Sequence, residues 1–423
     1  MSFEFKKVLF LGIGGVSMHQ LAISMSEIGV EVLGYDEKEN NYTALLKDAG
    51  IKVSNKFVRS FCNVDLCVKT PAVPETNKYV KELTQAGVKI IDRAELLSWL
   101  CKKFKKVIAV AGTHGKSTTA SLIYEILRQN NDKVSCHIGA DVKNPRFCLG
   151  DDFLVVEACE YNKSFLHLFP DITVVTNVEP DHMECYKNMF SLYSAFSKFL
   201  KRGEKRYVFA CPTTKFFKRI KNVCFVEKEK HYETSLEGEF NQNNISLAMK
   251  VCCDLGVEEK SAEKAVKSFC GIARRDEFLG SVGETKIFID YAHHPTEIEQ
   301  FYLMFKEKFN NPLVIFQPHT YSRTKFLKKQ FVSVLSKISN LMIFKEYPAR
   351  ETSKDGLSAF QLFQFVKEKN KGVTYFENDK IVKKILGNFD AVAFVGAGDI
   401  DQLAKNIIKT NQKNGWQILY FKL

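Results

Sequence analysis

The sequence lacks the features of a secreted or membrane-inserted protein. It contains no run of about 18 uninterrupted apolar residues, the length that a membrane-spanning helix needs. Its first residues, MSFEFKKVLFLGIGG, show no apolar segment followed by a small-residue cleavage site. A cytoplasmic protein without membrane insertion is therefore predicted.

Paired cysteine motifs are also missing. The 12 cysteines are scattered without a Cys-x-x-Cys set, and Cys252 and Cys253 are adjacent in sequence, which suits orderly disulfide pairing poorly. Reduced thiols that act as small core residues are expected, and no zinc site is predicted.

The sequence has no internal repeat and no nucleic-acid-binding module, although its formal net charge is +12. The lysines are spread along the whole chain and are not interleaved with aromatic residues in a recognisable RNA-binding pattern. A lysine-rich solvated surface is favoured over a nucleic-acid partner. A nucleic-acid-binding ATPase is the most distant alternative.

Strand-like and helix-like segments alternate throughout the 423 residues, which predicts α/β architecture with largely parallel sheets. The length suggests two or three domains. Three blocks are expected, at residues 1–104, 105–270 and 271–423. The predicted strands are Val8–Leu11, Glu31–Asp36, Val107–Ala111, Phe153–Val156, Ile172–Thr176, Arg206–Ala210, Lys286–Ile289, Leu313–Phe316, Leu341–Lys345 and Ala391–Val395. The predicted helices are Thr119–Leu127, Asn244–Leu255, Ala262–Phe269, Thr296–Phe309, Lys325–Ser336, Ser358–Lys369 and Asp379–Leu386.

A phosphate-binding loop is predicted at GTHGKST, between a strand and a helix. Backbone N–H groups in such a turn converge on phosphate oxygens, and the helix dipole adds positive potential. Lys116 is expected at the β- and γ-phosphates, and the Ser117 hydroxyl at Mg²⁺. The loop departs from the general phosphate-loop pattern, which requires a glycine at position 110. This sequence has valine there and matches only the shorter form of the pattern. The alternative is a glycine turn that caps a helix next to an incidental lysine.

A second glycine turn, Gly12-Ile-Gly14-Gly15, follows the first strand. It resembles a dinucleotide-binding turn without its third glycine, because position 17 is serine. Asp36 ends the second strand, where an acid can meet a ribose or a base. A nicotinamide-dependent dehydrogenase is the alternative here, but such an enzyme has no use for the loop at 112–118.

Two further residues are metal-ligand candidates. Glu157 directly follows one predicted strand, and His182 lies shortly after the next. Parallel strands present their carboxyl ends to the edge that holds the phosphate loop, where these side chains could hold Mg²⁺. Glu160 and Asp181 are rival acids at the two positions, and a structural histidine is an equal alternative for His182.

Taken in order, these and further segments resemble the Mur ligase family over essentially the whole chain. The segments are the opening GIGG, GTHGKST, EACEYNKSFL, TNVEPDHMECY, Arg274-Arg275, DYAHHPTEI, FQPHTYSRT and VGAGDI. The resemblance implies an α/β protein of three domains. The expected domains are a Rossmann-like UDP-binding domain, a P-loop central ATPase domain with a mainly parallel sheet, and a Rossmann-like C-terminal domain that binds the amino acid.

The resemblance also implies an activity and its partners. The expected enzyme is an ATP- and Mg²⁺-dependent ligase that adds L-alanine to UDP-N-acetylmuramic acid through an acyl phosphate, in peptidoglycan precursor synthesis. A monomer or homodimer is expected. The alternatives are a murein-peptide ligase of cell-wall recycling, whose pocket for the incoming peptide must be larger, and a divergent nucleotide-binding protein without ligase activity.

Site roles follow from the resemblance, position by position. The residues implied to bind ATP are Gly112, Thr113, His114, Gly115, Lys116, Ser117, Thr118, Asn241, Asn244, Arg275 and Asp290. Those implied to bind the UDP-sugar are Gly14, Gly15 and Asp36, and those near the amino acid are His293, His319 and Arg323. The implied metal ligands are Ser117, Glu157 and His182; Lys116, Glu157 and His182 are the implied catalytic set.

Each role has a structural alternative. Asn241 and Asn244 could be helix caps, His293 could simply precede a helix, and Arg274-Arg275 could be an exposed hinge. The sequence also departs from the family pattern. Phe240 replaces a histidine, Ser17 and Gln20 replace glycines, Ile289 replaces an acid, and Asn162-Lys163 is unusual after EACEY.

Overall fold

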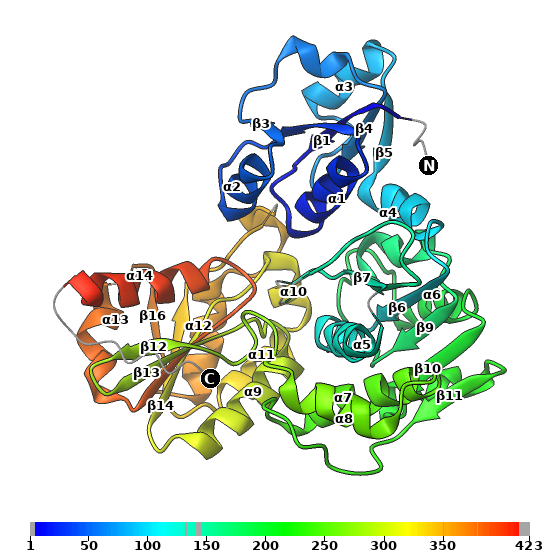
Figure 1. Cartoon of the computed structure of the whole chain (residues 1–423). Coiled ribbons are helices and arrows are strands. Elements are labelled where there is room, and N and C mark those ends of the chain that lie inside the picture. The colour runs from blue at the N-terminus through cyan, green and yellow to red at the C-terminus, as the bar shows by residue number, and fades with distance from the viewer. Residues whose placement is uncertain are drawn as a thin grey trace. The chain divides into compact units, whose positions relative to one another are not determined.

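The computed structural model describes residues 5–131, 133–140, 142, 145–349, 351–378 and 380–413. The chain forms two compact units, which are described separately. The first consists of Met1–Glu179, Met189–Thr234 and Asn243–Phe269. The second consists of Pro180–Asn188, Ser235–Gln242 and Cys270–Leu423. Figure 1 follows these segments by colour along the chain.

The first unit begins with a five-stranded parallel sheet in the order β3-β2-β1-β4-β5. Its strands are β1 (Lys7–Leu11), β2 (Glu31–Tyr35), β3 (Lys52–Ser54), β4 (Leu66–Lys69) and β5 (Lys89–Asp92). The helices between and after them are α1 (Val16–Glu27), α2 (Asn41–Asp48), α3 (Lys78–Gln85) and α4 (Arg93–Cys101). A capping box of Asn40 and Thr43 starts α2, which satisfies backbone donors at the helix end.

A six-stranded parallel sheet follows, in the order β11-β10-β9-β6-β8-β7. Its strands are β6 (Lys106–Ala111), β7 (Val134–His137), β8 (Phe153–Glu157), β9 (Ile172–Val175), β10 (Lys205–Phe209) and β11 (Val223–Val226). The associated helices are α5 (Lys116–Asn130), α6 (Met189–Leu200), α7 (Glu239–Cys253) and α8 (Glu259–Ser268). The central strands β6, β8 and β9 consist mainly of buried apolar residues, as expected of a parallel sheet covered on both faces.

The second unit contains a six-stranded sheet in the order β12-β13-β17-β14-β15-β16. All its pairs are parallel except the antiparallel hairpin of β12 and β13. The strands are β12 (Glu277–Val282), β13 (Thr285–Asp290), β14 (Pro312–Phe316), β15 (Leu341–Phe344), β16 (Thr374–Phe376) and β17 (Ala391–Val395). The helices are α9 (Pro295–Lys308), α10 (Tyr321–Phe326), α11 (Lys328–Leu335), α12 (Ala359–Lys369), α13 (Lys380–Ile385) and α14 (Ile400–Lys413).

Helices cover both faces of this third sheet. Alternate residues of one strand enter opposite cores: Phe288 packs with α9, α11 and α12, whereas Ile287 and Ile289 pack with α13 and α14. This alternation follows from the two-residue period of a strand.

Most predicted elements are confirmed within a few residues, and one helix prediction is wrong. The helix predicted at Lys325–Ser336 is instead two helices, α10 and α11, that meet at Leu327. Leu327 is 1% exposed and lies between the two helices with φ −96° and ψ 16°, and no proline or glycine stands at the break. Seven strands were not predicted from the sequence: β3, β4, β5, β7, β11, β12 and β16. The predicted start of the last short helix, Asp379, lies outside the described residues.

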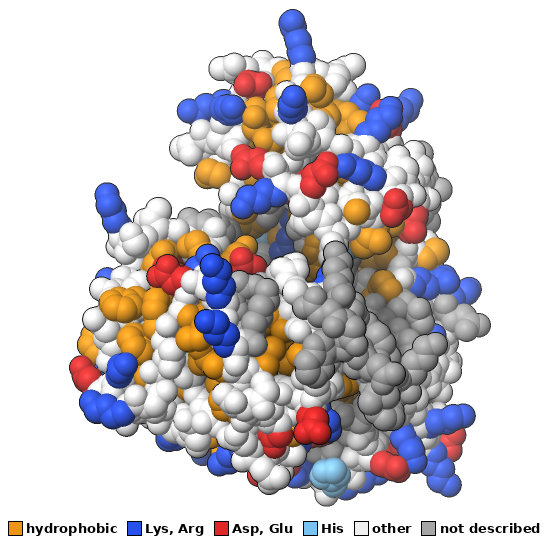
Figure 2. All heavy atoms as spheres, turned by 90° about the vertical axis from the view of Figure 1, so that its left-hand side faces the viewer, with side chains coloured by type: hydrophobic (Ala, Val, Ile, Leu, Met, Phe, Trp, Pro, Cys, Tyr) orange, Lys and Arg blue, Asp and Glu red, His pale blue; other side chains and the backbone are white. Residues whose placement is uncertain are grey.

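The charged side chains are dispersed, as the spread of lysines along the sequence predicts. On the face shown in Figure 2, Lys and Arg side chains lie singly or in small groups among acidic and neutral ones. All 12 cysteines are free thiols, but only Cys67, Cys101, Cys136 and Cys252 are buried, so the expectation of core residues holds for these four. Among the described residues, no helix is both long and apolar enough to cross a lipid bilayer.

Candidate active site

The loop between β6 and α5 has a backbone that only glycine fits at two positions. Gly112 and Gly115 have φ angles of 148° and 77°, in the region that side chains disfavour. A Cβ atom at Gly112 would collide with the Thr176 side chain, and one at Gly115 with Asn244. The loop therefore turns tightly into the N-terminus of α5, where backbone N–H groups lack helical partners.

Lys116 folds back across this loop. Its Nζ donates to the carbonyl oxygens of Gly112 at 2.5 Å and Thr113 at 3.0 Å, and lies 3.1 Å from the carboxylate of Glu160. Burial disfavours the ammonium, but the Glu160 carboxylate outweighs that effect and holds the pKa of Lys116 above its usual value. Lys116 therefore carries a positive charge at the N-terminus of α5.

Ser117 and Glu157 meet at the same edge of the sheet. The Ser117 hydroxyl donates to Glu157 Oε2 at 2.8 Å, and the Gly139 N–H donates to the same oxygen at 2.9 Å. A hydroxyl and a carboxylate are the oxygen ligands that Mg²⁺ prefers. The donor set therefore fits a magnesium ion held against a phosphate in the loop.

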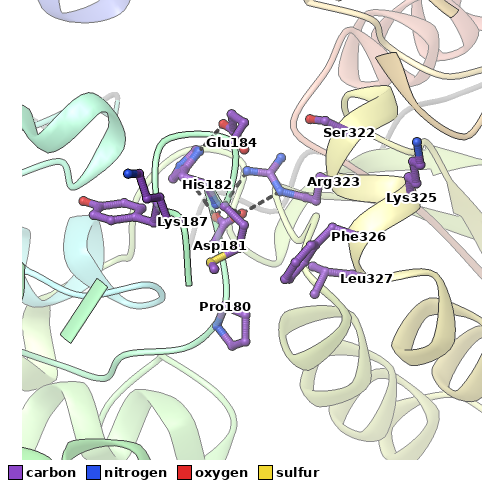
Figure 3. Close-up of a pocket in the computed structure, with 12 residues that line it drawn as sticks. Pro180, Asp181, His182, Glu184, Lys187, Ser322, Arg323, Lys325, Phe326 and Leu327 are labelled. Carbon is purple, nitrogen blue, oxygen red and sulfur yellow. Dashed lines mark hydrogen bonds and ion pairs between the residues drawn. The ribbon is translucent and has the colours of Figure 1, made fainter. Parts of the chain in front are cut away.

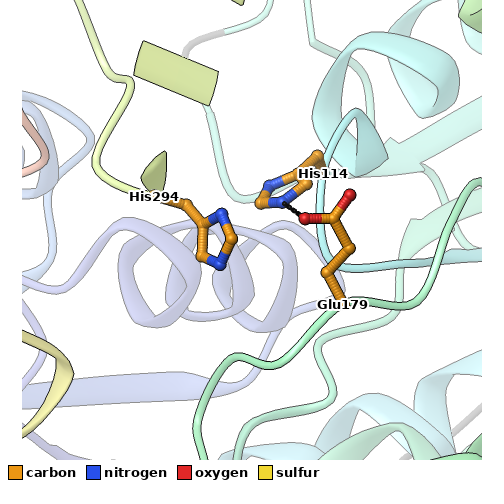
Figure 4. Close-up of side chains that lie close together, drawn as sticks. All are labelled: His114, Glu179 and His294. Carbon is orange, nitrogen blue, oxygen red and sulfur yellow. Dashed lines mark ion pairs between the residues drawn. The ribbon is translucent and has the colours of Figure 1, made fainter. Parts of the chain in front are cut away.

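The segment after β9 fixes the loop from the side. Asn177 bonds His114 twice, accepting from its backbone N–H at 2.9 Å and donating to its carbonyl at 3.0 Å. The Glu179 N–H donates to the Thr113 hydroxyl at 2.8 Å. The Glu179 carboxylate lies 3.5 Å from His114 Nε2. Figure 4 draws this pair. These bonds hold the loop in its curved form, which lowers the ordering cost of binding a phosphate.

The glycine turn after β1 is held by Asp36 and Asn40. The Gly14 N–H donates to Asp36 Oδ2 at 2.9 Å, and the Asn40 side-chain amide donates to the Gly14 carbonyl at 3.0 Å. A side chain at Gly14 would press on Asp36, Asn40 and Thr43 at once. Asp36 therefore shapes the turn itself, at the start of α1.

In the second unit, a buried ion pair joins two segments far apart in sequence. Arg323 Nε and Nη2 donate to the two carboxylate oxygens of Asp181 at 2.8 and 3.2 Å, and Arg323 Nη1 lies 3.0 Å from His319 Nδ1. Burial alone raises the pKa of a carboxyl group, but Arg323 outweighs it and holds the pKa of Asp181 well below its usual value. Both side chains are less than a tenth exposed.

A cavity of about 310 Å³ opens beside this pair. Asp181, His182 and Glu184 line it from one segment, and Ser322 and Lys325 from α10 (Figure 3). His182 has a φ of 53° and lies between two acids, with Nε2 at 3.6 Å from Asp181 and Nδ1 at 3.4 Å from Glu184. The cavity thus combines an imidazole with charges of both signs.

Three further predicted residues surround Tyr291 in the second unit. His293 Nδ1 lies 3.0 Å from the Tyr291 carbonyl, and burial lowers the pKa of His293 to about 3, so this imidazole is neutral. The Arg275 guanidinium lies over the Tyr291 ring at 5.3 Å. Burial raises the pKa of Asp290 to about 6, although Arg275 and backbone N–H groups oppose the shift.

Comparison with known proteins identifies the family. Three family models match the chain in succession: "Mur ligase family, catalytic domain" at residues 7–105, "Mur ligase middle domain" at 110–243 and "Mur ligase, glutamate ligase domain" at 274–398. A UDP-N-acetylmuramate–L-alanine ligase of Caldicellulosiruptor saccharolyticus is 32% identical over 95% of this chain and 98% of its own length. One of Flavobacterium psychrophilum is also 32% identical, over 96% and 98%. The chain belongs to the Mur ligase family.

Solved structures share the Mur ligase fold. A UDP-N-acetylmuramate–alanine ligase of Thermotoga maritima matches with a TM-score of 0.81 at 24% identity, over 96% of this chain and 99% of that one. A murein peptide ligase of Psychrobacter arcticus matches with a TM-score of 0.72 at 19% identity, over 96% and 98%. The expected α/β fold of three Mur ligase domains is therefore confirmed.

The structure brings several predicted residues of this Mur ligase together. Lys116, Ser117 and Glu157 lie at one edge of the second sheet, and Thr119 Oγ1 donates to Asn244 Oδ1 at 3.2 Å beside the loop. Asn241 donates to the Glu237 carbonyl at 2.7 Å and belongs, with His182, to the second unit. His319 and Arg323 are in contact there, and the His293 and His319 rings lie 5.9 Å apart.

Some contacts were missed or assigned differently from sequence. Glu160, one of the two rival metal-ligand candidates, pairs with Lys116 in this structure, and it stays a candidate. Asp181, the other rival candidate, pairs with Arg323 and also stays a candidate. Asn177 was not singled out, although its place directly after β9 puts it at the edge where parallel strands end. Of the departures from the family pattern, Ile289 is 1% exposed and serves as a core residue, whereas Phe240 is 38% exposed.

Proposed function

We propose that this Mur ligase is a UDP-N-acetylmuramate–L-alanine ligase. It activates the lactyl carboxylate of UDP-N-acetylmuramic acid with ATP and joins the product to L-alanine. The observation that carries the proposal is the convergence of Lys116, Ser117 and Glu157 at the turn from β6 into α5. The names of the relatives that match nearly the whole chain support the choice of substrates.

The nucleotide is assigned to the loop at 112–118. Backbone N–H groups at the start of α5 meet the phosphates, and Lys116 provides a fixed positive charge there. Thr118, on α5, is proposed to bind the nucleotide as well. Asn244, which lies next to Gly115, is proposed to face the adenine together with Asn241. Arg275 and Asp290 are the proposed nucleotide contacts from the second unit.

Two carboxylate-containing groups of residues are proposed to hold Mg²⁺. Ser117 and Glu157 form the first, and His182, between Asp181 and Glu184, contributes to the second. Bound Mg²⁺ would neutralise phosphate charge, which weakens the repulsion between a carboxylate and a triphosphate. The protein's own part is to position groups and to supply the charge of Lys116.

The proposed reaction has two steps. A carboxylate oxygen of the sugar attacks the γ-phosphorus of ATP, the bond to the ADP oxygen breaks, and an acyl phosphate forms. The alanine nitrogen then attacks the acyl carbon, inorganic phosphate leaves, and the nitrogen loses a proton as the amide forms. Gly14, Gly15 and Asp36 are the proposed contacts of the UDP portion, at the start of α1.

The amino acid is assigned to the surroundings of His293, His319 and Arg323. Because burial keeps the His293 imidazole neutral, it does not repel the positively charged end of free alanine. Asp181 occupies Nε and Nη2 of Arg323, so the amino-acid carboxylate is expected to meet Nη1, where His319 now lies. We place the reaction in the cytoplasm, in peptidoglycan precursor synthesis.

Product formation with competing amines tests this function. Purified protein is supplied with UDP-N-acetylmuramic acid and Mg-ATP, and ADP release is followed with L-alanine, glycine, L-serine or a murein tripeptide. We expect saturable turnover that needs the UDP-sugar and is fastest with L-alanine. Preference for the tripeptide would instead assign the chain to cell-wall recycling, and no ligated product with any amine would contradict a ligase.

Replacing Glu157 with glutamine tests the metal assignment. The amide removes the negative charge beside Ser117, so the Mg²⁺ concentration needed for half-maximal turnover should rise at least about tenfold. Glu204→Gln is the matched control, because Glu204 is exposed on the same domain. If the two variants need the same Mg²⁺ concentration for half-maximal turnover, Glu157 is not a Mg²⁺ ligand.

A further inference from the structure

Arg93 stands out as a cation without a carboxylate partner at the edge of the first sheet. It is the first residue of α4, directly after β5. Its Nη1 donates to the Ser17 hydroxyl at 2.6 Å, and Ser17 is the second residue of α1, two positions after Gly15 of the glycine turn. Among the described residues, no carboxylate lies within 4.0 Å of the guanidinium.

The acids nearest to Arg93 are committed elsewhere. Asp92, its neighbour in sequence, binds Lys69 Nζ at 3.0 Å. Glu157, which acts on Arg93 only at longer range, accepts from Ser117 and from Gly139. Burial is the main effect on Arg93 and lowers its pKa, which means that the positive charge is poorly solvated. A partly buried cation of this kind is stabilised by an anion.

Ser17 and His137 hold the guanidinium in place. The Ser17 hydroxyl lies 2.6 Å from His137 Nε2 as well as from Arg93. His137 is 2% exposed, and burial lowers its pKa to about 3, so it adds no competing charge. The planar guanidinium thus faces the start of α1, where helix N–H groups also favour an anion.

We propose that Arg93 binds an anionic group of the sugar nucleotide, with Ser17 as its positioning residue. This inference rests on the proposed function, because it takes the UDP-sugar as the ligand of the first domain. Two anions of that ligand have the right chemistry: the diphosphate and the lactyl carboxylate. The contact with Ser17, beside the glycine turn, favours the diphosphate.

The affinities of three nucleotides for Arg93→Gln distinguish a contact with the diphosphate from a contact with the lactyl carboxylate. Kd is measured by calorimetry for UDP, UDP-N-acetylglucosamine and UDP-N-acetylmuramic acid, of which only the last has the carboxylate. A diphosphate contact weakens all three at least about tenfold, whereas a carboxylate contact weakens only the last. Ser17→Ala is expected to weaken the same ligands by a smaller factor, because the guanidinium stays but loses its anchor.

Controls distinguish a binding role from a structural one. Arg59→Gln, an exposed arginine of the same domain, should bind all three nucleotides like the wild type. Mg-ATP binding and the thermal midpoint of Arg93→Gln should also stay close to wild type. If Arg93→Lys folds and restores part of the affinity, the charge is responsible. Wild-type affinity for UDP-N-acetylmuramic acid in folded Arg93→Gln would overturn the proposal, whereas no binding by the wild type would count against the proposed function.

Discussion

Replacing Lys116 with alanine is expected to lower kcat for ligation by about a hundredfold to a thousandfold or more. Lys116 carries the positive charge at the mouth of α5, and its Nζ lies among the loop carbonyls where the phosphates are proposed to bind. Charge that develops on the transferred phosphoryl group is then left without its fixed counterpart. The measurement is ADP release at saturating substrates. Affinity for the UDP-sugar, by calorimetry, should be close to wild type.

Two further variants make this result interpretable. Lys116→Ala also removes the ion pair with Glu160, so Lys116→Ala/Glu160→Gln shows whether the loss follows the missing lysine or an unbalanced acid. Lys106→Ala changes an exposed lysine at the opposite end of β6 and should leave turnover unchanged. Undiminished turnover in folded Lys116→Ala would refute the role given to this residue.

Replacing Asp181 with asparagine is expected to destabilise the second unit by roughly 3–5 kcal/mol, the usual effect of breaking a buried ion pair. The substitution leaves the Arg323 guanidinium buried without its two-point partner. Hydrogen exchange at the amides of β14 and β17 measures the effect within this unit. Asp181→Asn/Arg323→Met should recover much of the loss, because neither charge then remains buried.

The same pair predicts a dependence on pH. Since Arg323 holds the pKa of Asp181 below its unfolded value of about 4, the pair's contribution is fully present above that pH. It is lost as the pH falls through the lower, folded pKa. Acidification should therefore destabilise the second unit of the wild type more than that of Asp181→Asn.

Lys325→Met is the matched control for the buried pair. Lys325 lies two residues beyond Arg323 on α10, but its side chain is exposed, so its replacement should change stability by less than about 0.5 kcal/mol. If Asp181→Asn changes the stability of the second unit as little as Lys325→Met does, the ion pair does not stabilise this unit.

Local sequence patterns predicted the strand, glycine turn and helix around residues 112–118 well, because this geometry is encoded in consecutive residues. Gly112, Gly115, Lys116 and Ser117 lie within six positions, and a buried strand and a helix frame them. The position of Glu157 at a strand end also sufficed to place it beside Ser117, since parallel strands share an edge. Fold class followed from the same alternation of strands and helices.

Local sequence patterns could not predict contacts between residues that are far apart in the chain. Asp181 and Arg323 are 142 positions apart, and nothing near either residue indicates that they neutralise each other. The same holds for Ser17, Arg93 and His137, which come from three separate elements. Of the seven strands that were not predicted, six have only three or four residues, too few for a clear alternation pattern. The seventh, β12, contains a register shift between Phe278 and Gly280.

The transfer of oxygen from substrate to phosphate tests the central claim most directly. UDP-N-acetylmuramic acid with heavy-isotope oxygen in its lactyl carboxylate is converted with Mg-ATP and L-alanine, and the phosphate released is examined by mass spectrometry. Because the carboxylate is proposed to attack the γ-phosphorus, one labelled oxygen should leave in each inorganic phosphate. Unlabelled phosphate, or label in AMP, would contradict activation through an acyl phosphate at the Lys116 loop.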